Sequence, residues 1–116
     1  MPPTVNHPRR GEVWPVSQPG DPHAPRPGLI ISENERNQNA TSVLVIPIWT
    51  SSPPGPTRVP LRAGEGGIAH ASVLVCDDVT RIAKRHLGER AYGTVTVAVL
   101  KKAVQAIRIA IGDPTA

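Results

Sequence analysis

Residues 43–48 read Val-Leu-Val-Ile-Pro-Ile, and this uncharged, mostly β-branched stretch decides the fold class. A continuous apolar run of this length predicts a strand buried on both faces, because a strand with one solvated face alternates apolar and polar residues. A polar, proline-rich loop follows at residues 50–55. The stretch therefore predicts a domain built on a β-sheet.

Shorter strands are expected on both sides of this one. They are predicted at residues 11–16, 28–31, 57–61, 72–76 and 93–95, where apolar residues alternate with polar ones or form short runs between turns. Pro15 places the first of them at a sheet edge or at a bulge. The asparagine-rich residues 33–41 predict a loop or a single helical turn, and residues 82–87 predict one helical turn.

The C-terminal region has the period of an amphipathic helix. Thr96 is a suitable N-cap and Gly112 a suitable residue just beyond the C-terminus. Residues at spacings of three or four predict the core-facing stripe, namely Val97, Leu100, Val104, Ile107 and Ile111. Ala103, Ala106 and Ala110 broaden this stripe. Val99 and Ile109 lie partly off this stripe and indicate a second buried face, for which a subunit interface is one cover. Short strands followed by one helix predict a small curled antiparallel barrel capped by a helix.

Length and composition limit the remaining possibilities. The 116 residues fit one folded domain, expected at residues 10–112, between a flexible leader at 1–9 and a short tail at 113–116. The net charge of +4 favours polyanionic partners. Cys76 is the single cysteine and lies in an apolar run, which predicts a buried, inert thiol. The chain has neither metal-ligand spacing nor an apolar run of the ~20 residues a membrane span needs, so we expect a cytoplasmic protein without membrane contact.

Several motifs, taken in order, resemble one known family. They are Arg10-Gly11-Glu12-Val13-Trp14, Arg26-Pro27-Gly28-Leu29-Ile30-Ile31-Ser32, Ile46-Pro47-Ile48-Trp49-Thr50-Ser51, Ser72-Val73-Leu74-Val75-Cys76-Asp77-Asp78-Val79 and the helix that closes at Ile111-Gly112. Each is unspecific alone, but the ordered set over residues 9–112 resembles the MazF/PemK toxins of type II toxin–antitoxin systems.

The resemblance implies a fold, an activity and partners. The implied fold is mainly β with α: an SH3-like (CcdB/PemK-like) antiparallel barrel with a C-terminal helix, usually a homodimer. The implied activity is sequence-selective, metal-independent and cofactor-free cleavage of single-stranded RNA by the 2′-hydroxyl, which leaves a cyclic phosphate and a 5′-hydroxyl. The implied partner besides RNA is a MazE-like antitoxin, acidic or with a flexible tail.

By motif match, Arg26 and Thr50 are the expected catalytic residues. A guanidinium is permanently charged and can hold two phosphate oxygens, so Arg26 suits the stabilisation of the charge that develops on the phosphate. The hydroxyl of Thr50 can hydrogen-bond a phosphate oxygen or the 2′-hydroxyl. Without the resemblance, the residues themselves favour the plainer interpretation, in which Arg26 is a surface loop charge and Thr50 a strand-end cap.

A second set of residues is expected to bind RNA. It comprises Asp21, His23, Asn34, Ser51, Ser72 and Asp78. Carboxylates and amides can read base edges, although the same residues also form caps and turns. His23 is the riskier hypothesis of a general base, because its ordinary pKa lies near neutrality, and an exposed loop histidine is the plainer interpretation. Trp49 either stacks on a base or belongs to the core or to a dimer interface.

Two other functions remain open from the sequence. One is a non-catalytic, CcdB-like toxin that binds DNA gyrase, which would have no need of the Arg-Pro motif. The other is an RNA-binding module without turnover, kept open by the unusual loop at residues 18–25. RNA cleavage in EDTA separates the ribonuclease implied by the resemblance from both of these functions.

Overall fold

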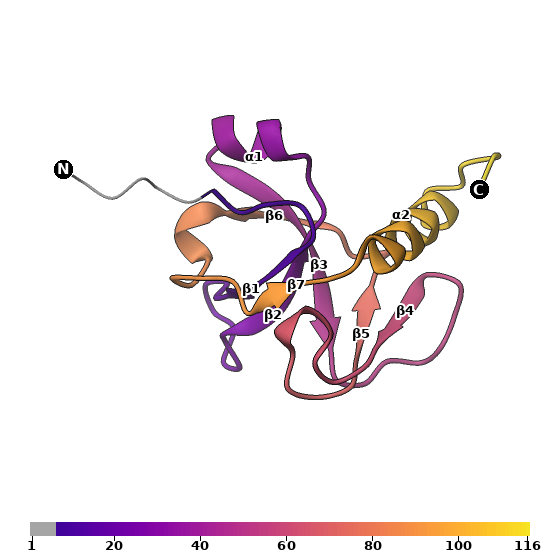
Figure 1. Cartoon of the computed structure of the whole chain (residues 1–116), viewed down its shortest axis with the longest axis horizontal. Coiled ribbons are helices and arrows are strands. Elements are labelled where there is room, and N and C mark those ends of the chain that lie inside the picture. Colours follow the sequence, from indigo (N-terminus) through magenta and orange to yellow (C-terminus); the bar gives the residue numbers. More distant parts are fainter. Residues whose placement is uncertain (1–6) are drawn as a thin grey trace.

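The computed structural model describes residues 7–116, which form a curled antiparallel sheet with one long helix beside it (Figure 1). The strands are β1 (Glu12–Val16), β2 (Arg26–Ile30), β3 (Ser42–Trp49), β4 (Arg58–Leu61), β5 (Ser72–Val75), β6 (Thr80–Ala83) and β7 (Gly93–Thr94). The helices are α1 (Asn34–Asn39) and α2 (Val97–Ala110), with short 3-10 turns η1 (Glu65–Gly67) and η2 (Lys84–His86). The expected class, a mainly β domain with a C-terminal helix, is confirmed.

Strand β3 organises the sheet. The strand order is β4-β5-β3-β2-β1-β7, and β6 pairs with β3 as well. On one side β3 pairs with β2; on the other side its first half pairs with β6 through Val45, and its end pairs with β5 from Ile48. Pro47 lies between these two partners, where its missing N–H breaks no hydrogen bond of either ladder. The sheet bends at this point from one partner strand to the other.

The central strands bury both faces, as residues 43–48 predicted. Val43 and Val45 join one apolar cluster together with Trp14 and Ile82. The neighbouring Ile46 joins a second cluster. Because successive strand residues point to opposite faces, the two clusters lie on opposite sides of the sheet. Cys76 belongs to the second cluster and is 1% exposed, so the expected buried thiol is confirmed.

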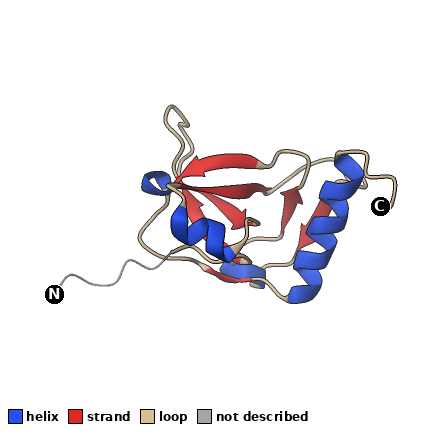
Figure 2. Cartoon of the chain, turned by 90° about the horizontal axis from the view of Figure 1, so that it is seen from above, coloured by secondary structure: helices blue, strands red, loops and turns tan. Residues whose placement is uncertain are grey.

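Helix α2 covers the sheet with part of the expected stripe: Leu100 and Ile107 pack against the core, but the residues at the two ends do not. Figure 2 shows the helix lying along one end of the sheet. Its buried residues are Val99, Ala103 and Ala106, whereas Val97 and Ile111 are 66% and 74% exposed. Small alanines let the helix backbone approach the sheet closely, and this decides which face turns inward. Thr96 is the N-cap, accepting from Val99 N–H, and Gly112 follows the C-cap with φ +72°, both as expected.

Two expectations about the smaller elements were wrong. Residues 82–87 do not form one helical turn: Thr80–Ala83 is strand β6, and only Lys84–His86 turns as a 3-10 helix. Strand β1 is not an edge strand, because it pairs with β2 and β7. Strand β7 pairs only with Glu12 and Val13, so Pro15 lies beyond its end and its missing N–H breaks no hydrogen bond to β7. The carbonyl of Pro15 accepts from Gly88 N–H (2.9 Å).

Helix α1 is the expected helical turn in the asparagine-rich region, and a buried network fixes it. The side chain of Asn37, fully buried, donates to the carbonyl of Ser32 (2.9 Å) and accepts from the Ser32 hydroxyl. The same hydroxyl accepts from Leu44 N–H, which joins α1 to β3. Asn37 is therefore structural.

Residues of the expected leader and of the expected tail both make contacts in the structure. Within the expected leader, residues 1–6 lie outside the described residues, and Arg9 N–H donates to the Glu12 carboxylate (2.6 Å). At the other end, the tail residue Asp113 is ion-paired with Arg108 of α2. Among residues 7–116, no helix is long and apolar enough to cross a membrane.

Candidate functional site

The register of the sheet places one set of side chains on a common face. Val16 pairs with Arg26, Gly28 with Pro47, and Val45 with Thr80. Since alternate residues share a face, this side of β3 continues through Val45 and Pro47 to Trp49.

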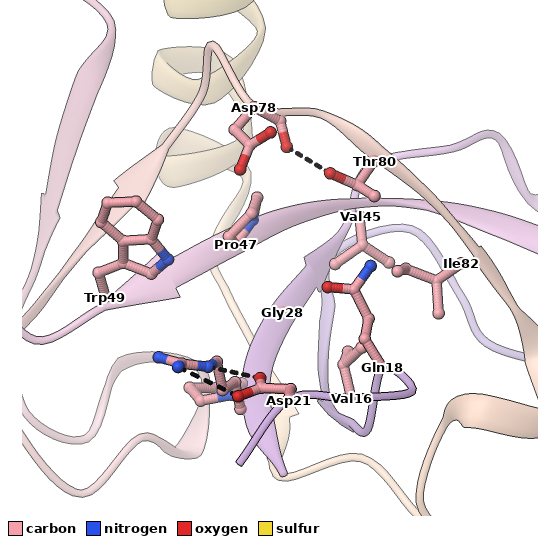
Figure 3. A pocket seen from close by; sticks show the side chains of 12 residues that line it. Val16, Gln18, Asp21, Gly28, Val45, Pro47, Trp49, Asp78, Thr80 and Ile82 are labelled. Carbon is pink, nitrogen blue, oxygen red and sulfur yellow. Dashed lines mark hydrogen bonds and ion pairs between the residues drawn. The ribbon is translucent and has the colours of Figure 1, made fainter. Parts of the chain in front are cut away.

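A pocket of about 280 Å³ opens on this face, and we call it the central pocket (Figure 3). It is lined by Val16, Gln18, Asp21, Arg26, Pro27, Gly28, Val45, Pro47, Trp49, Asp78, Thr80 and Ile82. Gly28 lies beneath two of the lining side chains: a Cβ there would come within 2.3 Å of Val45 Cγ1 and 3.1 Å of Val16 Cγ2. The glycine after the Arg-Pro pair therefore lets these two valines pack directly on β2.

A second hollow of about 460 Å³ lies beside the first, and we call it the strand-end hollow. It is lined by Pro25, Arg26, Pro27, Ile48, Trp49, Thr50, Ser51 and Ser72. Arg26, Pro27 and Trp49 line both spaces and form the wall between them. The two expected catalytic residues, Arg26 and Thr50, thus face one hollow.

Local structure explains how the hydroxyls reach this hollow. β3 ends at Trp49, and Thr50 and Ser51 are exposed residues just beyond it. Ile48 pairs with Leu74 and Trp49 with Val73, so the same register continued by one residue sets Thr50 opposite Ser72. Ser72 is nearly buried and donates to the carbonyl of His70 (2.8 Å). Thr50 and Ser51 are the more accessible hydroxyls.

Arg26 is held by a carboxylate from the preceding loop. Asp21 Oδ2 accepts from Arg26 Nε at 2.6 Å, and Asp21 Oδ1 accepts from an Nη of Arg26 at 3.2 Å. The Arg26 hydrogen bond, followed by the backbone N–H of His23, lowers the pKa of Asp21 below its ordinary value. The same ion pair raises the pKa of Arg26. The guanidinium is therefore a fixed cation with one side bound to Asp21.

Of the six residues expected to bind RNA, four line one of these two spaces and two do not. Asp78 and Asp21 line the central pocket, and Ser51 and Ser72 line the strand-end hollow. Asn34 lies elsewhere: its Oδ1 accepts from Arg10 N–H (2.7 Å), and it borders a separate hollow beside Trp14. His23 is exposed and lines neither the central pocket nor the strand-end hollow.

Gln18 and Thr80 line the central pocket and were missed from the sequence. Thr80 was overlooked because no strand was expected before the helical turn predicted at residues 82–87. In the structure, burial along β6 alternates from half-buried Thr80 through exposed Arg81 to buried Ile82, but Thr80 and Arg81 are both polar, so the sequence itself does not alternate. Gln18 carries no signal in the sequence either, because its position depends on how the loop after β1 returns to β2.

Together these residues offer a fixed cation and accessible hydroxyls across one hollow. A guanidinium suits a phosphate, since its planar N–H groups match a pair of phosphate oxygens. A guanidinium carries five N–H donors, of which Asp21 takes two, so three remain for a ligand. The fold and the site define a small curled-sheet domain that presents an arginine and a threonine at the end of its central strand.

Comparison with known proteins places the domain in a family. The family model for the PemK-like, MazF-like toxin of type II toxin-antitoxin systems matches residues 9–111. The chain belongs to this family.

Solved structures agree with this assignment. An endoribonuclease from a Mycobacterial species, solved in complex with its cognate antitoxin, is 28% identical, with a TM-score of 0.79 over 92% of this chain and 97% of that one. The Mycobacterium tuberculosis toxin MazF-mt6 is 27% identical, with a TM-score of 0.77 over 87% and 96%. A MazE-MazF structure from Deinococcus radiodurans is 18% identical, with a TM-score of 0.78 over 93% and 98%, a likeness of fold alone.

Proposed function

We propose that this protein is the toxin of a toxin–antitoxin pair and cleaves single-stranded RNA selectively at short sequences, without a metal or other cofactor. The single observation that carries the proposal is that Arg26 and Thr50, 24 positions apart in the chain, line one hollow at the end of β3. Family membership and the similar endoribonuclease structures support the same activity.

The proposed reaction is an internal phosphoryl transfer. The 2′-oxygen of one nucleotide attacks the adjacent phosphorus, and the bond from phosphorus to the 5′-oxygen of the next nucleotide breaks. The products are a 2′,3′-cyclic phosphate and a 5′-hydroxyl. The 2′-hydroxyl loses one proton and the departing oxygen gains one, so the step needs no co-reactant.

Arg26 would stabilise the transition state. Its remaining N–H groups bind the phosphate oxygens on which negative charge accumulates. The raised pKa of Arg26 makes it a poor general base, so its role is electrostatic. Thr50 would hydrogen-bond the attacking 2′-hydroxyl or a phosphate oxygen, with Ser51 and Ser72 as further contacts to the strand.

We also propose the partners that the family suggests. A MazE-like antitoxin with an acidic or flexible segment would cover the two hollows and compete with RNA for Arg26, and a net charge of +4 favours both polyanions. Among the similar structures, the endoribonuclease from a Mycobacterial species is in complex with its cognate antitoxin, and the Deinococcus radiodurans structure is of MazE-MazF. The active form would be a cytoplasmic homodimer.

The test is cleavage of a mixed single-stranded RNA pool in EDTA, with both new ends mapped chemically. We expect the purified chain to leave cyclic phosphate and 5′-hydroxyl ends. Arg26→Ala and Thr50→Ala should each lower kcat/KM by about 100- to 1000-fold, the usual effect of losing one transition-state donor.

Arg62→Ala is the matched control, because Arg62 is exposed and lies outside both hollows. It should cleave within about threefold of the wild type, as surface substitutions away from a site generally change little. Intact RNA after incubation with the wild-type chain, or cleavage only when a divalent metal is added, would contradict the proposal. Tight RNA binding without turnover would instead favour an RNA-binding module.

A further inference from the structure

The central pocket has no part in the reaction described above, although it shares a wall with the strand-end hollow. Its volume of about 280 Å³ lies just below the ~300–1,000 Å³ of small-ligand sites. Its apolar lining includes Val16, Val45 and Ile82, with both valines packed directly over Gly28. Polar side chains stand on the rim (Figure 3).

An exposed indole forms the wall between the two spaces. Trp49 is 42% exposed, whereas Trp14, the other tryptophan, is 7% exposed and donates from Nε1 to Glu12. Within residues 7–116, Trp49 Nε1 has no hydrogen-bond acceptor. A large aromatic face kept in solvent beside a phosphate-sized hollow suits stacking on an unpaired base.

A carboxylate that makes no hydrogen bond or ion pair within residues 7–116 stands on the opposite rim. The neighbouring Asp77 is bound by Arg58 at 2.6 Å, and Asp21 is bound by Arg26. Asp78 bonds the described chain through its backbone alone: its N–H donates to the carbonyl of Val75 (3.1 Å), and its carbonyl accepts from the Thr80 hydroxyl (2.9 Å). In Figure 3 its carboxylate projects toward the pocket, across from Gln18. Two acceptor oxygens are therefore free for a ligand.

The chemistry of these groups selects among the four bases. An ionised carboxylate only accepts hydrogen bonds, through two adjacent oxygens. Guanine alone presents two adjacent N–H donors, at N1 and at the 2-amino group, on the edge left open in a single strand. Adenine and cytosine present one amino group, and uracil presents one N–H between two acceptors that a carboxylate repels. The amide of Gln18 can donate to guanine O6.

We propose that the central pocket binds a guanine base, which stacks on Trp49 and donates from its N1–H and 2-amino groups to Asp78. This inference rests on the proposed function, because the base belongs to a nucleotide that flanks the phosphate held by Arg26. Arg26 and Trp49 line both spaces, so a short strand can fill both at once. The pocket thereby makes cleavage dependent on sequence.

The first experiment maps cleavage of a randomised single-stranded RNA pool. The wild type should show guanine enriched at one fixed position next to the cut. Asp78→Asn, which replaces one acceptor oxygen with a donor, should reduce that preference by about 10- to 100-fold, as for other bidentate base contacts. Inosine, which lacks the 2-amino group, should be cut at a rate between those of guanine and adenine in an otherwise identical oligonucleotide.

The stacking wall is tested separately. Trp49→Ala should raise KM by about 10-fold or more with little change in kcat, in line with the loss of one base–aromatic stack, and Trp49→Phe should restore most of the affinity. Tyr92→Ala is the matched control, because Tyr92 is 47% exposed and lines neither hollow. Glu35→Gln, an exposed carboxylate on α1, is the control for Asp78→Asn.

The outcomes separate this inference from the proposed function. Cleavage without guanine at either flanking position, or a guanine preference that survives Asp78→Asn, would overturn the inference and leave the ribonuclease standing. If the wild type cuts no RNA, the proposed function fails and binding alone decides the inference. Oligonucleotides with 2′-deoxy sugars are then titrated against wild type and Trp49→Phe. Fluorescence quenching of Trp49 by guanine-containing but not uracil-containing strands supports the pocket; equal or absent quenching rejects it.

Discussion

Asp21 acts on a neighbouring side chain before it can act on any ligand. Both of its carboxylate oxygens bind the guanidinium of Arg26, and one of them also accepts from the backbone N–H of His23. The sequence predicted that Asp21 contacts RNA. For such a contact Asp21 would have to release this ion pair. The geometry favours a role in positioning: the carboxylate holds Arg26 in one orientation toward the strand-end hollow.

Replacing Asp21 should therefore affect turnover more than binding. We expect Asp21→Asn to lower kcat by about 10- to 100-fold, because small displacements of a catalytic group have effects of that size, and Asp21→Glu to recover part of the loss. The lowered pKa of Asp21 keeps it ionised, so it should add no pH dependence above about pH 5.

The measurement is kcat and KM on one defined RNA oligonucleotide between about pH 5 and 8. A raised KM with unchanged kcat would instead place Asp21 in direct contact with RNA. Arg62→Ala is again the control: Arg62 lies outside the site, so this variant should keep the kcat and KM of the wild type.

Single residues differed in how far the sequence could predict them. Cys76 was predictable because its environment is its own apolar run, and burial raises the pKa of its thiol to about 11. Arg26 and Thr50 were predictable only through the resemblance, since nothing local in either residue indicates the other. The need for glycine at position 28 was not predictable, because it depends on Val16 and Val45 of the neighbouring strands, which pack directly over it.

At the scale of elements, strength of the local signal decided what could be predicted. β3 and α2 have long apolar patterns and were found within a few residues of their ends. β6 was missed because four residues form a strand only when a partner is present, and that partner is the first half of β3. The inward face of α2 was predicted only in part. The helical period placed Ala103 and Ala106 on it correctly, but it set Val99 on a second face, whereas Val99 is buried against the sheet.

The end of α2 carries a testable electrostatic contact. Arg108 Nε donates to Asp113 Oδ2 at 2.9 Å, and the same carboxylate accepts from the backbone of Thr115 at 2.8 Å. These contacts, the Arg108 hydrogen bond first, lower the pKa of Asp113 from 3.8 to about 2. Because the folded pKa lies below the unfolded one, this stability is complete above about pH 4 and is lost as the pH falls toward 2.

Asp113→Asn should thus lower the melting temperature at neutral pH, and its difference from wild type should shrink between about pH 4 and 2. Thermal unfolding followed by circular dichroism over that range measures the difference. Glu89→Gln, an exposed carboxylate away from α2, should show no such convergence. A difference that stays constant down to pH 2 would mean that the ion pair does not stabilise the helix end.

At the scale of the whole molecule, one side of α2 exposes an apolar surface within residues 7–116. Val97, Val104 and Ile111 are seven residues apart, so they follow one side of α2, and Val97 and Ile111 are largely exposed. A hollow of about 500 Å³ runs along this side between Arg10 and α2. The sequence assigned these three residues to the core together with Leu100 and Ile107; only the latter two pack against it, and the other three form a side that a second subunit can cover.

A homodimer through this face is expected to depend on Val97. Light scattering after size-exclusion chromatography should give twice the chain mass of 12.3 kDa for the wild type and about 12.3 kDa for Val97→Glu, because a carboxylate buried in an apolar interface lacks a partner. Lys102→Glu makes a larger charge change at an exposed position of the same helix, and it should stay dimeric. A wild-type chain that is monomeric at every concentration, or a Val97→Glu chain that remains dimeric, would remove α2 as the interface. Comparing the RNA cleavage rate of monomeric Val97→Glu with that of wild type then tells whether one subunit completes the site, because Arg26 and Thr50 already share a hollow within a single chain.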